Sequence, residues 1–167
     1  MAYRFLRKDY DALLAKMEAL AGALRETGQE KGRWADQGAE TWHDNFGYEE
    51  EQRQEWTLSD RLEDFVRMKD DAEVVQGRAI DEVDVGTQVT VRDTGTGEQR
   101  TFVIGSYQVL DRQHRNEISY AAPFARPFMG ARIGEERLVA IGDRAVVYRV
   151  VSIEQVDALD AVRTSPA

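Results

Sequence analysis

The chain has 167 residues, enough for one ordinary domain or two small ones, and 42% of them are hydrophobic. It contains no cysteine, which excludes disulfides and thiolate metal sites, and it has no apolar run long enough to cross a membrane. We therefore expect a soluble, cytoplasmic protein. The net charge of -9 is concentrated, because residues 36–73 carry 13 acidic and 4 basic groups. Such a surface excludes free duplex DNA as a partner, since phosphate binding needs Lys and Arg.

The first predicted element is a long helix from about Lys8 to Gln37. Its apolar residues recur at alternating spacings of four and three, which is the pattern of a coiled-coil seam. The seam consists of Leu6, Tyr10, Leu13, Met17, Leu20 and Leu24. We expect Asp9 to stabilise the start of this helix, because a carboxylate there lies near the positive helix end.

A second long helix is predicted to begin near Tyr48. Its apolar stripe consists of Leu58, Leu62, Phe65, Met68, Ala72 and Val75. Two stripes of similar length on either side of one loop predict an antiparallel helical hairpin, a coiled coil in which each helix covers the seam of the other. We assign this hairpin to residues 1–77, with its tip at 39–47.

From Gly86 onward the hydrophobic period changes to two, which indicates strands. Strands are predicted at 87–91, 100–104, 117–120, 138–141 and 145–153. A short helix is predicted over Pro123–Arg132, with Pro123 at its first position, and Pro127 should keep it short or kinked. The fold class is therefore α+β, with an antiparallel sheet domain of about five strands over 78–157 and a disordered tail over 158–167.

The predicted tip has a composition that a simple chain reversal does not need. Carboxylates, a histidine and large aromatic side chains stand together in Glu40, Thr41, Trp42, His43, Asp44, Asn45 and Phe46. The aromatic residues either pack the narrow end of the hairpin or contact a partner, by stacking on it or by acting as a wedge. The acidic run is either a solvated helix face or a surface for a basic channel or a metal ion.

The tip resembles the corresponding motif of the bacterial Gre family of transcript cleavage factors. Glu40–Tyr48 lines up without a gap with the family pattern Gly-Asp-Leu-(Ser/Lys)-Glu-Asn-Ala-Glu-Tyr. Asn45 and Tyr48 match, and Asp44 stands where the family has Glu. The first acidic residue of the family aligns with Thr41.

A second match lies in the predicted sheet domain, and the resemblance spans about residues 7–156. The family segment Ile-Ser…Ser-Pro-Ile-Ala-Arg-x-Leu-Ile-Gly is similar to this chain at Ile118, Ser119, Pro123, Ala125, Arg126 and Gly130, before an acidic pair at Glu135 and Glu136. The resemblance implies an FKBP-like sheet domain that docks at the rim of the RNA polymerase secondary channel. Candidate docking residues are Pro123, Phe124, Arg126 and Gly130.

The resemblance also implies how the hairpin acts. The hairpin enters the secondary channel, and the tip carboxylates help to hold the second Mg²⁺ of the polymerase, so that the polymerase cleaves backtracked RNA. Metal ligation would then fall to Asp44 and Glu40, only within the polymerase complex. The chain itself would be a monomer without enzymatic turnover or a cofactor of its own, and the nascent RNA 3′ end would be a second partner of the tip.

Departures from the family pattern lead to three functional hypotheses. A hydroxyl at Thr41 is a weaker Mg²⁺ ligand than a carboxylate, so the first hypothesis is a channel-binding regulator whose cleavage activity is weak or absent. The second is a fully active cleavage factor that uses Asp44 with Glu40. His43 is interpreted as a contact or pH-sensitive residue, and Asp44 could instead cap the second helix.

The third hypothesis is a prolyl isomerase or chaperone carried by the FKBP-like domain. Such a site needs a concave apolar pocket lined by aromatic side chains. The sheet domain offers Phe102, Tyr107, Tyr120, Phe124, Phe128 and Tyr148 for it. In a segment of this size most of these rings are needed for the core.

Overall fold

The computed structural model describes residues 2–36, 46–76 and 81–156. Its elements are β1 (Tyr3–Leu6), α1 (Arg7–Asp36), α2 (Phe46–Asp70), β2 (Ala72–Val75), β3 (Thr87–Asp93), β4 (Gln99–Gly105), β5 (Glu117–Ser119), the 3-10 helix η1 (Arg126–Phe128), β6 (Glu136–Ile141) and β7 (Arg144–Gln155). The predicted α+β class is confirmed.

The chain divides into two compact units, which we call the sheet unit and the hairpin unit. The hairpin unit is Asp11–Asp71, and the sheet unit is Met1–Tyr10 together with Ala72–Ala167. The first turn of α1 therefore belongs to the sheet unit, although the helix continues into the hairpin. The predicted boundary at residue 77 is wrong in this respect, because it placed residues 1–10 and 72–77 in the hairpin, whereas they belong to the sheet unit.

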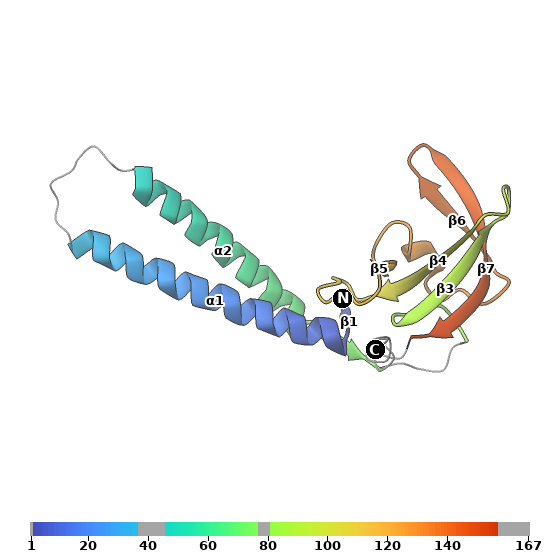
Figure 1. Ribbon diagram of the computed structural model, residues 1–167, viewed down its shortest axis with the longest axis horizontal. Coiled ribbons are helices and arrows are strands. Elements are labelled where there is room, and N and C mark those ends of the chain that lie inside the picture. Colours follow the sequence, from blue (N-terminus) through green and yellow to red (C-terminus); the bar gives the residue numbers. More distant parts are fainter. Residues whose placement is uncertain (1, 37–45, 77–80, 157–167) are drawn as a thin grey trace, which may run out of the picture. The chain divides into compact units, whose positions relative to one another are not determined.

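In the hairpin unit, α1 and α2 follow one another in antiparallel directions (Figure 1). The predicted seams are confirmed within the unit. Leu13 is buried, and the other seam residues are half-buried, namely Met17, Leu20, Leu24, Leu58, Leu62, Phe65 and Met68. The positions between them are mostly exposed, as expected for two amphipathic helices.

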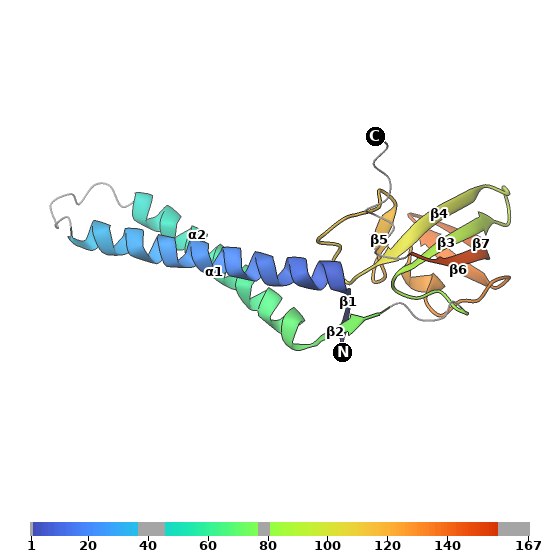
Figure 2. The same cartoon turned by 60° about the horizontal axis from the view of Figure 1, so that its bottom comes forward.

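The residues at the outer ends of the two predicted seams lie in strands and not in helices. α2 ends at Asp70, and Ala72–Val75 pairs with Tyr3–Leu6 in a parallel two-stranded sheet (Figure 2). Leu6 and Val75, which the heptad pattern placed in the coiled coil, are direct partners in that sheet. Placing them on helices was wrong, because β-branched and aromatic residues at these short ends gain more from strand pairing than from another helical turn.

The larger sheet has five strands in the order β5-β4-β3-β7-β6. All neighbours are antiparallel except β4 and β5, which are parallel, and a bulge interrupts the β3–β7 pairing between Thr90 and Val91. The tight turn predicted between the last two strands is present. Gly142 occupies it with a φ of 59°, a left-handed conformation that favours glycine.

The predicted helix at Pro123–Arg132 is only the single turn η1, and it starts three residues later than expected. Pro127 lies at the beginning of this turn. Proline has no backbone N–H and is tolerated at the start of a helix but not in its interior, so a longer helix from Pro123 is excluded. The expectation of a short helix was correct, whereas its predicted start was wrong.

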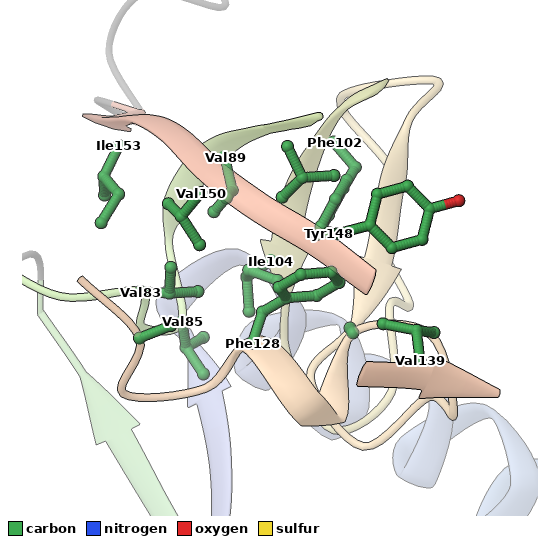
Figure 3. Packing of buried hydrophobic residues seen from close by; sticks show 13 residues of the cluster. Val83, Val85, Val89, Phe102, Ile104, Phe128, Val139, Tyr148, Val150 and Ile153 are labelled. Carbon is green, nitrogen blue, oxygen red and sulfur yellow. The ribbon is translucent and has the colours of Figure 1, made fainter. Parts of the chain in front are cut away.

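One hydrophobic core fills the inner side of the five-stranded sheet (Figure 3). It consists of Val83, Val85, Val89, Val91, Phe102, Ile104, Ala125, Phe128, Ala131, Val139, Tyr148, Val150 and Ile153. Phe128, from η1, lies with its ring centre 5.7 Å from that of Phe102 and 6.1 Å from that of Tyr148. The FKBP-like character of this sheet stays a prediction.

Candidate functional site

The predicted tip residues are only partly within the structure. Glu40, Thr41, Trp42, His43, Asp44 and Asn45 lie outside the described residues, and so does the predicted tail. Phe46 is the first residue of α2. Because α1 ends at Asp36 and α2 begins at Phe46, the candidate residues are the segment that joins the two helices.

The described part of the hairpin continues the acidic character of the tip. Glu49 lies in the first turn of α2, where a carboxylate is favoured by the helix dipole. Between residues 49 and 70, eight carboxylates accompany four basic side chains. Several of these carboxylates are exposed, including Glu49, Glu50 and Asp60. The hairpin is therefore suited to basic surroundings.

The predicted docking segment is divided between surface and core. Pro123, Arg126 and Gly130 are exposed, while Phe124 is half-buried. The Phe124 ring lies edge-on to Tyr148, at 5.8 Å between ring centres. Phe124 therefore packs beneath the segment, and the three exposed residues stay candidates for docking.

The aromatic side chains considered for an isomerase pocket are used in packing instead. Phe102 and Tyr148 are buried in the core, and Phe124 packs on both. A second aromatic group consists of Tyr3, Tyr107 and Tyr120. The ring centre of Tyr107 lies 4.6 Å from that of Tyr3 and 6.2 Å from that of Tyr120. A cavity of about 490 Å³ beside β2 is lined by aliphatic and polar residues such as Val75, Glu82 and Thr87, and by no aromatic side chain. This geometry does not favour the isomerase hypothesis.

A buried polar cluster that the sequence analysis did not predict fixes the first turn of α1 within the sheet unit. Asp9 is completely buried. One of its oxygens accepts hydrogen bonds from the backbone N–H groups of Leu110 and Asp111 at 2.7 and 2.8 Å, and the other accepts one from Ser106 Oγ at 2.5 Å. The prediction that Asp9 serves its own helix start is incomplete, since its hydrogen-bond partners come from a loop a hundred residues away.

The second carboxylate of this cluster is Glu117, which is also completely buried. Lys8 Nζ lies 2.7 Å from Glu117 Oε1 and 3.0 Å from Asp9 Oδ2, so one ammonium group faces two carboxylates. Gly105 makes room for this arrangement, because a Cβ there would lie 2.7 Å from Val109 Cγ2 and 3.0 Å from Glu117 Cγ. The only sequence signal for the cluster was an Asp in a first helical turn.

β1 is held to the sheet unit by a further ion pair. The guanidinium of Arg4 bonds both carboxylate oxygens of Asp84, at 2.5 and 2.9 Å. This bidentate hydrogen bonding raises the pKa of Arg4, and partial burial opposes it. The N-terminal segment is thus an integral part of the sheet unit.

The described residues offer neither a metal centre of their own nor a membrane span. Within those ranges, no group of three or more His, Cys, Asp or Glu side chains could hold a metal ion. Similarly, none of the described helices is long and apolar enough to cross a membrane.

Comparisons with known proteins point to the family suggested by the sequence motifs. Residues 78–155 match the family model for the transcription elongation factor GreA/GreB C-terminal domain. The chain is 24% identical to transcription elongation factor GreA of Thermosipho africanus over 111 residues, which is 66% of this chain and 70% of that protein. It is also 24% identical to GreA of Thermotoga neapolitana over 151 residues, or 90% of this chain and 96% of that one.

Among solved structures, GreA factor homolog 1 of Thermus thermophilus is similar, at 19% identity and a TM-score of 0.44, with 92% of this chain and 99% of that chain covered. The family-model match covers the sheet domain, which contains the exposed Pro123, Arg126 and Gly130. Residues 78–155 thus match the GreA/GreB C-terminal domain, and the chain is similar to Gre transcription elongation factors.

Proposed function

We propose that this protein binds RNA polymerase through its sheet unit and inserts the hairpin tip into the secondary channel, where it modulates the active centre. The observation that carries the proposal is the match of residues 78–155 to the GreA/GreB C-terminal domain, on a chain whose preceding residues form two long antiparallel helices. An elongation factor needs a docking domain and a reach to the active centre. A helix of 30 residues such as α1 spans ~45 Å.

The electrostatics of the hairpin support insertion into a cationic channel. Eight carboxylates against four basic groups on residues 49–70 make α2 strongly acidic. Complementary charge raises the rate of association more than it tightens the final complex. The sheet unit should therefore supply most of the affinity, with Pro123, Arg126 and Gly130 at the contact.

The chemistry of the tip favours weak cleavage. Asp44 and Glu40 offer the hard carboxylate oxygens that Mg²⁺ prefers, whereas Thr41 offers only a neutral hydroxyl. A Mg²⁺ ion held by the polymerase would supply the charge stabilisation for phosphodiester hydrolysis. The chain would contribute ligands and positioning without turnover of its own, and it would bring one carboxylate fewer than the family pattern.

The aromatic tip residues complete the proposed mode of action. Trp42 and Phe46 are bulkier than the Leu and Ala of the family pattern, and at His43 an imidazole replaces Ser or Lys. In a narrow channel they would occupy space near the RNA 3′ end. Regulation by occupation of the channel, with little stimulation of cleavage, follows from these substitutions.

The test uses stalled, backtracked elongation complexes incubated with the protein, and RNA shortening is followed across a Mg²⁺ titration. We expect the natural protein to bind polymerase and to shorten RNA slowly. Thr41→Asp should raise the cleavage rate by roughly tenfold, and Asp44→Ala should abolish the remaining activity while polymerase binding persists.

Thermal melting provides the control for this pair of variants. If Asp44 only caps α2, its replacement lowers the melting temperature, whereas loss of a metal ligand leaves it nearly unchanged. Rapid cleavage by the natural protein would favour the fully active alternative, with Asp44 and Glu40 as the ligands. Absence of polymerase binding would contradict the proposed function as a whole.

A further inference from the structure

Among the described side chains of the hairpin unit, the most exposed large apolar one is Trp56, on α2. It is 65% exposed, whereas Leu14 and Val66, the other exposed large apolar residues of this unit, are each 37% exposed. At 100° per residue, Trp56 lies about 200° from Leu58 around the helix axis. Trp56 therefore faces away from the seam formed by Leu58, Leu62 and Phe65, and it does not hold the hairpin together.

The face around Trp56 is acidic. Helical neighbours three, four or seven residues away share that face. The uncharged ones are Gln52 and Ser59, and the charged ones are Glu49, Arg53, Asp60 and Glu63. All four charged residues are exposed. The single guanidinium of this set, on Arg53, lies 3.4 Å from a carboxylate oxygen of Glu50 and is partly neutralised by it. Glu63 is in turn partly neutralised by Arg67, whose Nη2 lies 3.4 Å from its carboxylate, so Glu49 and Asp60 contribute most of the negative charge. Trp56 is thus an indole ring in a negatively charged surrounding.

An indole and a carboxylate favour the same kind of ligand. The face of the Trp ring attracts a cation through its quadrupole, and the neighbouring carboxylates add an ordinary Coulomb attraction. A nucleic acid backbone is repelled by the same carboxylates, and so is the identical face of a second copy of the chain. The surface therefore fits an Arg or Lys side chain presented by another protein.

We propose that Trp56, flanked by Asp60 and Glu63, is a lateral docking point at which an Arg or Lys side chain of the polymerase channel wall stacks on the indole ring. This inference rests on the proposed function, because it names a partner for the body of the hairpin rather than for its tip. A contact at this position fixes how deeply and in which rotational orientation the hairpin lies in a channel. It also gives the hairpin an anchor that is separate from the sheet unit.

The test compares full-length variants for binding to RNA polymerase, measured as equilibrium affinity and dissociation rate at several salt concentrations. Trp56→Ala should weaken binding by about three- to tenfold, mostly through faster dissociation. Asp60→Lys should weaken it most at low salt, because it reverses a charge facing a cation. Val66→Ala is the matched control, on the same helix and also exposed, and it should leave affinity unchanged.

Stability separates docking from a structural role. Trp56 is largely exposed, so Trp56→Ala should melt within a degree or two of the natural protein, and Trp56→Phe should recover part of the lost affinity. Equal affinity of Trp56→Ala and the natural protein for polymerase would overturn the inference while the proposed function stands. If the natural protein itself does not bind polymerase, the proposed function fails, and this inference fails with it.

Discussion

The hairpin unit and the sheet unit of this protein bury their side chains in different ways. Leu13 is the one fully buried apolar residue among the described side chains of the hairpin unit, whereas the sheet unit has a core of 13 buried residues. A pair of helices has a single shared face, while a sheet covered by η1 and its flanking loops encloses side chains from several directions. The thermodynamic stability of the protein should therefore reside in the sheet unit.

The comparison also shows why the sheet unit includes residues from the start of the chain. Phe5 and Asp9 are completely buried there, and Arg4 pairs with Asp84. A hairpin inserted between Tyr10 and Ala72 interrupts the sequence of the sheet unit without interrupting its packing. The contrast between the two units can be tested by changes that remove parts of one and not of the other.

The largest effect is expected from truncation at the boundary suggested by sequence. Fragment 78–167 lacks β1, β2, Lys8 and Asp9, so Glu117 loses the ammonium group of Lys8 and Ser106 loses the carboxylate of Asp9. It also lacks Leu6 and Val75, which pack against the core. Loss of a partner from a buried ion pair costs ~3–5 kcal/mol, a large part of the ~5–15 kcal/mol of a typical domain. We expect this fragment to be largely unfolded by circular dichroism and denaturant titration.

A hairpin-deleted chain is the matched control for that truncation. It joins Tyr10 to Ala72 through a flexible linker of about ten residues, so that β1, β2 and the Asp9 cluster are retained. This chain should unfold cooperatively and should compete with the full-length protein for polymerase. Equal stability of fragment 78–167 and the hairpin-deleted chain would contradict the assignment of residues 1–10 to the sheet unit.

The next largest effect is expected from replacing a phenylalanine by alanine, and the loss of stability can be compared between the two units. Phe128→Ala removes a ring that is completely buried in the sheet unit and should cost ~3–5 kcal/mol of unfolding free energy. Phe65→Ala removes a half-buried ring from the hairpin seam and should cost ~1 kcal/mol, because water already reaches part of that ring. Denaturant unfolding followed by circular dichroism measures both, and equal losses would show that the hairpin is packed as tightly as the sheet unit.

A smaller effect is expected from Asp9→Asn, which keeps the shape of the side chain. The amide oxygen can still accept hydrogen bonds from Leu110 and Asp111, but the amide nitrogen cannot accept the one from Ser106 Oγ. We expect a loss of ~1–3 kcal/mol in thermal or denaturant unfolding. Asp60→Asn, an exposed carboxylate on α2, serves as the control and should change stability little; an equally small loss for Asp9→Asn would mean that the cluster is not essential.

The smallest effect is expected on the stability of the fold at acidic pH. Asp93 accepts hydrogen bonds from the backbone N–H groups of Thr96 and Gly95, and these bonds lower its pKa below 3.8. A lowered pKa means that the charged form stabilises the folded state above the ordinary pKa, and this contribution is lost as the pH falls through the lowered value. The melting temperature should fall slightly below about pH 4, and Asp93→Asn should reduce that dependence. If Asp93→Asn and the natural protein show the same dependence of melting temperature on pH, the acid sensitivity comes from other carboxylates. Glu135, whose pKa is also lowered, is one of them.

Much of this architecture follows from the sequence alone. The seams through Leu20 and Leu62 identify the long helices, and the alternation around Val89 and Val147 identifies the strands. Both patterns are local, because a helix or a strand places neighbouring residues on the same or on opposite faces with a fixed period. The family motifs around Asn45 and Pro123 likewise depend only on residue types at fixed spacings.

Only the tertiary structure decided which distant residues complete the sheet unit. The pairing of Tyr3–Leu6 with Ala72–Val75 and the hydrogen bonds from Asp9 to the loop at Leu110 join residues about 70 and 100 positions apart. Heptad spacing could not reveal them, since Leu6 and Val75 fit a helical seam as well as a strand. Their state was decided by the free energy of pairing and burial with partners that a local pattern does not contain.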